Sequence, residues 1–230
     1  MPPSADRLVL ATRNDAKLRE LARILGSKVR LAGLASFPGA PDVPETGATF
    51  EENALLKARA VARFTGLPAV ADDSGLCVDA LGGMPGVLSA RWAGGHGDDQ
   101  ANLDLVLAQV ADVPDDRLGA RFVCAAALVL PPDGPEDRAP REWVVTGTVA
   151  GRLTRVPRGS GGFGYDPIFL PDGFDVTTAE MTPEAKDAIS HRGRAFRALA
   201  PFITGMLGKG RIVYSQTEEG SDDRQAARPW

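Results

Sequence analysis

The stretch "RLVLATRNDAKLRELARIL", residues 7–25, contains a change of hydrophobic period that indicates the class of fold. Residues 7–12 are an apolar run typical of a buried strand. Apolar side chains then recur at helical spacing, at Leu18, Leu21, Ala22 and Leu25. Gly26 ends this pattern, so the sequence predicts a helix over 15–25 directly after the strand.

The next segments continue the alternation of strands and helices. Residues 29–34 predict a second strand, and the proline- and glycine-rich residues 37–48 predict a loop. A helix is predicted between Thr49 and Phe64, where Thr49 and Glu52 have the spacing of a capping box. Its inner face is expected to carry Leu56, Ala60 and Phe64.

The middle of the chain is richer in strands. "PAVADDSGLCVDAL", residues 68–81, predicts a buried strand that ends in two aspartates and resumes after a Ser-Gly turn. A helix is expected over 99–110, and the long β-like runs at 120–131 and 141–153 predict neighbouring antiparallel strands. A last helix is expected over 191–207.

These elements predict an α/β fold with a mixed central β-sheet flanked by helices, in two lobes with an active-site cleft between them. The expected domain covers residues 1–208, and the polar, aperiodic residues 209–230 are expected to be a disordered tail. A chain of 230 residues with 43% hydrophobic residues is long enough to bury a substantial core.

The charge balance and the cysteines limit the possible functions. A net charge of -4 argues against a broad basic surface, so neither direct binding of nucleic acid nor attachment to a membrane is expected. Cys77 and Cys124 lack the spacing of a zinc site and are expected to be buried free thiols. The sequence has no signal-peptide pattern and no long apolar span, which predicts a cytoplasmic protein.

The junction between the first strand and helix has the features of a phosphate site. Free N–H groups and the helix dipole attract anions there, Thr12 and Asn14 add neutral donors, and Lys17 adds a charge. Alternatively, Asn14 only caps the helix and Lys17 is solvated. A Walker pattern is missing from the stretch.

A second set of residues is suited to a metal ion bound together with phosphates. "ADDSG" at 71–75 places Asp72 and Asp73 on opposite sides of a strand, so one can face a cleft while the other binds backbone donors of the turn. Further acidic, amide and lysine side chains come from "PETG" and "EENALLK", at Glu45, Glu52, Asn53 and Lys57. Magnesium accepts such a set because it takes few protein oxygens and keeps substrate and water as other ligands. An ordinary turn and a solvated lysine are the alternative interpretation.

A third set of residues suggests recognition of a nucleobase. "GSGGFGYDP" at 159–167 allows close approach of the backbone and places Phe163 and Tyr165 beside Asp166. Lys186, His191 and Arg192 follow, and His191 could donate to a carbonyl oxygen of a ligand. A glycine-rich hairpin followed by a capped helix with a basic face would explain the same residues.

The order of these blocks resembles the inosine triphosphate pyrophosphatase family, also called Ham1-like or non-canonical purine nucleoside triphosphate pyrophosphatases. The resemblance extends from about Leu8 to Leu207. Six blocks carry it: "ATRNDAK", "ETGATFEENALLKA", "ADDSGL", "PGVLSARWAG", "GGFGYDPIF" and "AISHRGRA".

The resemblance implies a homodimer that converts ITP, dITP or XTP to the monophosphate and pyrophosphate with Mg2+. It implies Glu45 and Asp73 as metal ligands, Asp73 as the base and Lys57 as a catalytic helper. The implied substrate contacts are Thr12, Arg13, Asn14, Asp15, Ala16, Lys17, Ser74, Phe163, Gly164, Tyr165, Asp166, Lys186, His191 and Arg192.

Selectivity would come from donors aimed at the 6-oxo group, which an adenine amino group cannot satisfy. These residues do not explain how guanine, which is also 6-oxo, is excluded.

Two alternatives and one departure from the family pattern stay open. A Maf-like pyrophosphatase for modified nucleotides shares this chemistry, and a catalytically silent nucleotide sensor would share the binding residues. Arg13 stands where the family commonly has glycine. Its side chain is expected at the rim of the cleft with an ordinary negative φ, because positive φ would strain a non-glycine residue.

Overall fold

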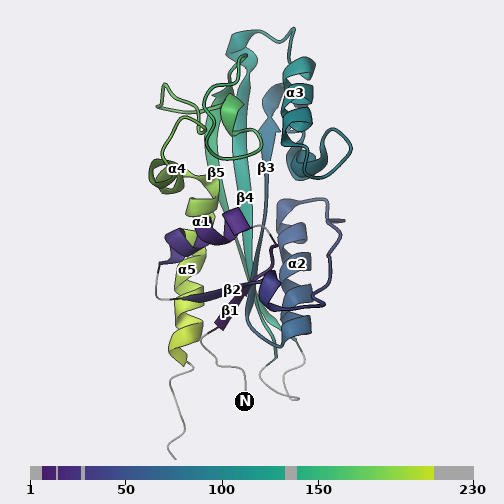
Figure 1. The fold of residues 1–230 in the computed structure, drawn as a ribbon, viewed down its shortest axis with the longest axis vertical. Coiled ribbons are helices and arrows are strands. Elements are labelled where there is room, and N and C mark those ends of the chain that lie inside the picture. The colour runs from purple at the N-terminus through teal and green to yellow at the C-terminus, as the bar shows by residue number, and fades with distance from the viewer. Residues whose placement is uncertain (1–6, 14, 27–28, 133–138, 210–230) are drawn as a thin grey trace, which may run out of the picture.

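The computed structural model describes residues 7–13, 15–26, 29–132 and 139–209 (Figure 1). Within these ranges the strands form a sheet of order β2-β1-β3-β4-β5-β6. Their bounds are β1 Arg7–Leu10, β2 Arg30–Gly33, β3 Ala69–Val78, β4 Gly119–Leu130, β5 Arg141–Leu153 and β6 Phe169–Pro171. β1 runs parallel to β2 and β3, whereas the pairs β3–β4, β4–β5 and β5–β6 are antiparallel. The predicted mixed sheet is confirmed.

Helices cover both faces of this sheet. They are α1 Asp15–Leu25, α2 Phe50–Thr65, α3 Asp99–Gln109, α4 Pro183–Ile189 and α5 His191–Lys209. Figure 1 shows α2 beside one face of the lower half of the sheet, α1 and α5 beside the other, and α3 near the upper end. The expected tail over 209–230 lies almost wholly outside the described residues.

The hydrophobic core follows the alternation of β3. Ala69 and Ala71 pack in the cluster under α2, whereas Val70 packs in the cluster under α1 and α5. A third cluster, which includes Leu103 and Val106 of α3, fills the upper end of the sheet. The two faces of β3 therefore belong to different helix layers, and the division into two lobes stays a prediction.

The start of α2 has the predicted cap with one difference. The Thr49 hydroxyl accepts a hydrogen bond from the Glu52 amide at 3.2 Å. The Glu52 carboxylate accepts one from the Ala48 amide at 2.7 Å, rather than from Thr49 as a standard capping box would have it. The helix ends at Gly66, which has a φ of 66°.

The predicted inner face of α2 is wrong. Phe64 is 47% exposed, and Leu56 and Ala60 are partly exposed. The buried stripe consists of Phe50, Asn53, Ala54, Ala58, Val61 and Ala62. Small alanines let the helix approach the sheet closely, which a larger inner stripe would prevent.

The predicted break in β3 is also wrong, because the strand continues through Ser74 and Gly75. These two residues pair with Cys124 and Val123 of β4. A Cβ at position 75 would clash with the Gly86 carbonyl oxygen and the Ser89 hydroxyl. Gly75 therefore serves close packing against the 3₁₀ segment Gly86–Arg91, not a turn.

The other sequence predictions that can be compared with the fold hold. Cys77 and Cys124 are buried free thiols, and burial raises the pKa of Cys124 to about 12. In the described part of the chain, the helices lack the length and apolar character that a membrane crossing requires.

Candidate active site

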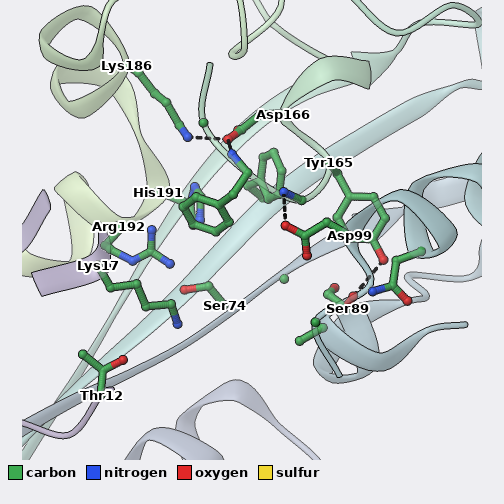
Figure 2. A pocket seen from close by; sticks show the side chains of 18 residues that line it. Thr12, Lys17, Ser74, Ser89, Asp99, Tyr165, Asp166, Lys186, His191 and Arg192 are labelled. Atoms are coloured by element: carbon green, nitrogen blue, oxygen red, sulfur yellow. Dashed lines mark hydrogen bonds and ion pairs between the residues drawn. The ribbon is translucent and has the colours of Figure 1, made fainter. Parts of the chain in front are cut away.

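A cavity of about 400 Å³ lies where the predicted motifs meet. Residues from β3, α3, the glycine-rich loop and the α4–α5 junction line it, together with the segment between β1 and α1 (Figure 2). The predicted residues among them are Thr12, Lys17, Ser74, Phe163, Gly164, Tyr165, Asp166, Lys186, His191 and Arg192. Its volume falls in the range of small-molecule sites.

Lys17 is placed at one end of this cavity by the first turn of α1. Its ammonium lies 3.5 Å from the Asp72 carboxylate, and Thr12 lines the cavity nearby. Asn14 lies outside the described residues, as do the side chains of Asp15 and Ala16. Their contacts with phosphate stay predictions.

Arg13 has the expected backbone conformation but turns toward the loop at residues 37–48. In the described ranges every positive-φ residue is a glycine, so the φ of Arg13 is negative. Its guanidinium donates to the Asp42 carboxylate at 3.1 Å and to the Ala40 carbonyl at 2.7 Å. The side chain is 54% exposed and pairs with the loop rather than lining the cavity.

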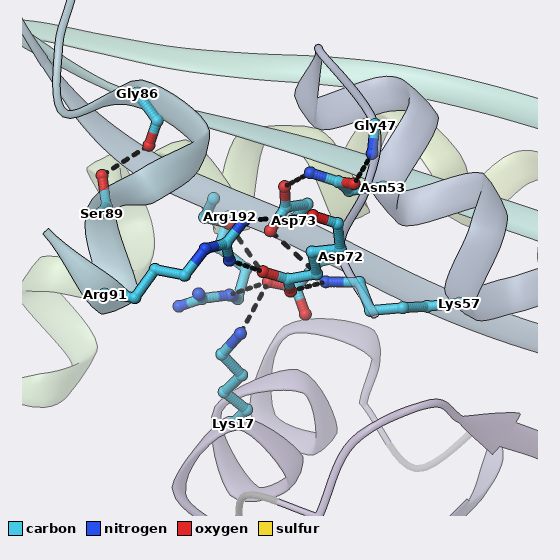
Figure 3. Close-up of polar contacts among 12 residues, drawn as sticks. Lys17, Gly47, Asn53, Lys57, Asp72, Asp73, Gly86, Ser89, Arg91 and Arg192 are labelled. Atoms are coloured by element: carbon cyan, nitrogen blue, oxygen red, sulfur yellow. Dashed lines mark hydrogen bonds and ion pairs between the residues drawn. The ribbon is translucent and has the colours of Figure 1, made fainter. Parts of the chain in front are cut away.

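Asp72 and Asp73 point in opposite directions, as strand alternation predicts, and have different partners (Figure 3). Asp72 accepts from Arg192 at 3.1 Å and from the Ser74 hydroxyl at 3.1 Å. The prediction that one of the two aspartates binds backbone donors of a turn is wrong, because the strand continues without a turn. Burial would raise the pKa of Asp72, but Lys17 and Arg192 outweigh it and hold that pKa well below its usual value.

Asp73 lies on the α2 side of the sheet. The Asn53 side-chain amide donates to it at 3.0 Å, and Lys57 lies 3.4 Å away. Asn53 is itself fixed, since its carbonyl oxygen accepts from the Gly47 amide at 2.7 Å. Burial raises the pKa of Asp73, and Glu45 adds to this effect while Lys57 opposes it.

Glu45 and Asp73 converge on the ammonium of Lys57. Lys57 lies 2.8 Å from Glu45, and Arg91 binds the same carboxylate at 2.9 Å. Burial opposes charge on Lys57, yet the surrounding acids raise its pKa overall. Lys57 and Arg91 likewise lower the pKa of Glu45 against the effect of burial.

Glu45 and Asp73 are hard oxygen ligands of the kind that Mg2+ prefers. Among the described residues, no cluster of three or more acidic, histidine or cysteine side chains could hold a metal ion. A metal ion at this pair would therefore need substrate oxygens and water for its remaining ligands.

Phe163 forms a partly open platform in the lining of the cavity. Phe163 is 40% exposed, and the Lys186 ammonium lies 5.1 Å and the Arg192 guanidinium 5.6 Å from the centroid of its ring. Asp166 fixes this arrangement, because it accepts from the Phe163 amide at 2.8 Å and from Lys186 at 2.5 Å. Gly162 leaves room for the carboxylate, with which a Cβ there would clash.

His191 lines the same cavity, where it is buried and its neutral form is favoured. Its ring stacks on Phe122 with centroids 4.8 Å apart. Burial, then Arg192 and Lys186, hold its pKa well below 6.5. A neutral imidazole has one donor and one acceptor nitrogen.

Tyr165 is a structural residue of the wall and not an open stacking surface. It is 4% exposed, and its hydroxyl donates to the Ser89 carbonyl at 2.8 Å. Asp99 at the start of α3 accepts from the Gly164 amide at 2.9 Å. Hydrogen bonds thus join the glycine-rich loop to the wall formed by α3 and the 3₁₀ segment.

The sequence interpretation missed several residues of this site. Ser89, Asp99, Asn102 and Phe122 line the cavity, and Glu20 binds Arg192 at 2.8 Å. Arg91 stands in the quoted block "PGVLSARWAG", which was a signal for its role. Ser89 stands in the same block. Asp99, Asn102, Phe122 and Glu20 lie in ordinary helix and strand patterns that give no such signal.

This arrangement of motifs matches that of known proteins. Residues 8–202 match the model of the Ham1 family. The chain belongs to the Ham1 family. A Ham1 relative from Streptomyces coelicolor, named dITP/XTP pyrophosphatase, is 60% identical and covers 88% of this chain and 99% of the relative. One of the same name from Nocardia farcinica is 59% identical, covering 88% and 97%.

Solved Ham1 structures have the same fold. The crystal structure of a nucleoside-triphosphatase / dITP/XTP pyrophosphatase from Mycobacterium abscessus is 57% identical with a TM-score of 0.68, covering 85% of this chain and 99% of that one. A HAM1 protein from Coxiella burnetii is 42% identical with a TM-score of 0.76, covering 86% and 98%. The predicted family and α/β fold class are confirmed.

Proposed function

We propose that this chain is a nucleoside triphosphate pyrophosphatase that converts ITP, dITP and XTP to the monophosphate and pyrophosphate. The observation that carries the proposal is the position of the cavity beside β3. Asp72 of this strand binds Lys17 and Arg192 of the cavity lining, and the next residue, Asp73, binds Lys57 (Figure 3). An aromatic platform with hydrogen-bond donors lines this cavity. Lys17 and Ser74 line it too: Lys17 binds Asp72, and Ser74 follows Asp73 on β3. The names of the Ham1 relatives support the same activity.

Base recognition is assigned to the aromatic platform. Phe163 would stack on the base, while Lys186 and Arg192, held beside its ring, would donate to the 6-oxo group. An adenine would place its own amino donor against these cations. Such a donor-to-donor contact leaves buried groups unpaired and excludes ATP.

Phosphate binding is assigned to the lysines and to the N-terminus of α1. Lys17 lies at the start of this helix, where the dipole also favours anions. Lys57 has a raised pKa and therefore stays protonated, so it acts as a cation and not as a base. Both charges would stabilise the negative charge that develops on the departing pyrophosphate.

Glu45 and Asp73 are the residues that would hold Mg2+. The pair fits this ion, since both are carboxylates and both already converge on one cation, the Lys57 ammonium. The bound ion would supply charge neutralisation at the phosphate oxygens. Family resemblance adds that the active form is a homodimer, which analytical ultracentrifugation would check. The lack of a signal-peptide pattern in the sequence adds a cytoplasmic location, which cell fractionation would check.

Asp73 is the residue proposed to accept the proton of the attacking water. Its raised pKa makes it a better proton acceptor than an exposed aspartate. The Asn53 side-chain amide holds one oxygen of the Asp73 carboxylate by its 3.0 Å hydrogen bond, and this also restricts the orientation of the other oxygen.

A substrate panel tests the function. Pyrophosphate release from ITP, dITP, XTP, GTP and ATP is measured with and without Mg2+. We expect turnover of the first three with Mg2+ and little of the last two. Equal rates on all five would reject the selectivity, preference for UTP or 7-methyl-GTP would indicate a Maf-like enzyme, and binding without turnover would indicate a sensor.

Asp73→Asn tests the assigned base. It should abolish pyrophosphate release with the fold intact, because the amide cannot take up a proton at neutral pH. Asp79→Asn is the matched control, since Asp79 forms an exposed ion pair with Arg121 at 2.9 Å away from the cavity. Retained activity in Asp73→Asn would remove that role from Asp73.

A further inference from the structure

Asn102 is a buried amide in the wall of the cavity that faces the cationic residues. It lies on α3, is 1% exposed and lines the cavity. Asp99, one turn earlier on α3, lies on the same side as Tyr165 and Ser89 in Figure 2, while Lys186, His191 and Arg192 lie on the other. A base on Phe163 would therefore be read from two sides.

The orientation of the Asn102 amide follows from its one strong partner. Its Oδ1 accepts a hydrogen bond from the Ala93 amide at 2.7 Å, which an NH₂ group could not do. The nitrogen must then be the other branch. Among the described residues this Nδ2 is buried and has no hydrogen-bond acceptor.

An unpaired buried donor is costly, so it requires an explanation. Two acceptors in the same wall, the Asp99 carboxylate and the Ser89 carbonyl, already receive hydrogen bonds. Asp99 accepts from the Gly164 amide, and the Ser89 carbonyl accepts from the Tyr165 hydroxyl. Because Asn102 lines the cavity, a group bound there is the acceptor that the structure leaves for this N–H.

The substituent at position 2 of a purine distinguishes the relevant bases. Xanthine has an oxygen there, hypoxanthine a hydrogen and guanine an amino group, while all three have an oxygen at position 6. With the 6-oxo group directed to the cationic residues, the 2-substituent points toward a different part of the cavity wall. A donor there accepts xanthine, tolerates hypoxanthine and rejects guanine.

We propose that Asn102 Nδ2 is this donor, so that Asn102 selects XTP and excludes GTP. The inference rests on the proposed function and names a specificity residue of the same site. The hydrogen bond from the Ala93 amide holds the Asn102 side chain in one orientation, so the discrimination does not depend on a side chain that can flip.

The test exchanges the donor for an acceptor of the same shape. Asn102→Asp keeps an oxygen for the Ala93 amide and replaces the NH₂ group by a second oxygen. The kcat/KM values for XTP, ITP and GTP are measured with Mg2+, and those for XTP and GTP are divided by that for ITP. We expect the XTP ratio to fall about tenfold and the GTP ratio to rise about tenfold, the usual effect of one well-placed hydrogen bond.

Gln109→Glu is the matched control on the same helix. The Gln109 oxygen accepts from the Trp92 indole at 2.9 Å outside the cavity, so this variant makes the same amide-to-carboxylate change without touching the base. Its ratios should equal those of the wild type. Unchanged ratios in Asn102→Asp would overturn the proposal, as would an equal change in the control.

The wild-type enzyme provides a second measurement that does not depend on folding of a variant. The proposal requires kcat/KM for XTP to equal or exceed that for ITP, and both to exceed that for GTP. GTP at or above ITP would overturn it. Absence of turnover on both ITP and XTP would instead reject the proposed function, so the two failures are distinguishable.

Discussion

Replacing Asp72 by asparagine should cost about 3 kcal/mol of unfolding free energy, because Asp72 is the acidic partner of a buried guanidinium. The two side chains are 2% and 3% exposed and lie 3.1 Å apart. Removal of one partner from a buried ion pair typically costs 3–5 kcal/mol, since a charge is left buried. Arg192 keeps Glu20 at 2.8 Å, and the asparagine oxygen remains an acceptor, so the lower end of that range applies.

The assay is urea unfolding of both proteins at pH 7, with a thermal melt in parallel. For a chain of this size, about 3 kcal/mol corresponds to a fall in Tm of roughly 6–12 °C. The control is Glu142→Gln, which breaks the ion pair with Arg59 at 2.6 Å. The Arg59 side chain is 46% exposed and the Glu142 side chain 23% exposed, so the loss of this solvent-screened pair should cost less than about 1 kcal/mol.

The pH dependence has a definite sign. Because the folded pKa of Asp72 is lowered, its contribution is complete above the unfolded pKa of about 3.9 and declines as pH falls below it. The difference between wild type and Asp72→Asn should therefore shrink below about pH 4. A cost under about 1 kcal/mol at pH 7, or an equal cost in the control, would refute the reasoning.

Three further changes have expected outcomes. Phe163→Ala should raise KM for ITP about tenfold or more with a smaller effect on kcat, because a stacking surface is lost; Phe174→Ala, exposed and away from the cavity, should not. Gly75→Ala should destabilise the fold by about 3 kcal/mol through its clash with Gly86 and Ser89, measured by urea unfolding, whereas Gly205→Ala, with open space around it, should be neutral or stabilising. His191→Asn should make the free energy of unfolding less dependent on pH between pH 7.5 and 5.5. Because the folded pKa of His191 is lowered, the unfolded wild type binds more protons than the folded wild type below about pH 6.5, so only the wild type loses stability there. Parallel pH profiles for His191→Asn and wild type would contradict this last expectation.

Local patterns in the sequence predicted most of the elements because each depends on neighbours along the chain. The helix over 15–25 ends at Gly26 as its spacing indicates, and the strands β4 and β5 pair as neighbours. The cap at Thr49 depends on a residue three positions later, and it formed. The sequence itself therefore contains the information for elements that depend only on residues a few positions apart.

The errors arose where a distant segment decides the local structure. Gly75 is typical of a turn, but the close approach of Gly86 and the pairing with β4 keep β3 continuous. Phe64 fits a helical apolar stripe, but the sheet selects the alanine face of α2 instead. Asn102 and Glu20 were missed for the same reason, since Ala93 and Arg192 reach them only in the folded chain.

The adjacent aspartates of β3 show how one strand serves two purposes. Asp72 faces α1 and α5, where Lys17 and Arg192 hold its pKa well below the usual value and favour its ionised form. Asp73 faces α2, where burial and Glu45 raise its pKa and make it a better proton acceptor. Neither aspartate can take the place of the other, because a shift of the strand by one position would turn each side chain to the opposite face of the sheet. Asp72 is therefore committed to the ion pairs with Lys17 and Arg192, whereas the raised pKa of Asp73 suits the proton transfer proposed for it.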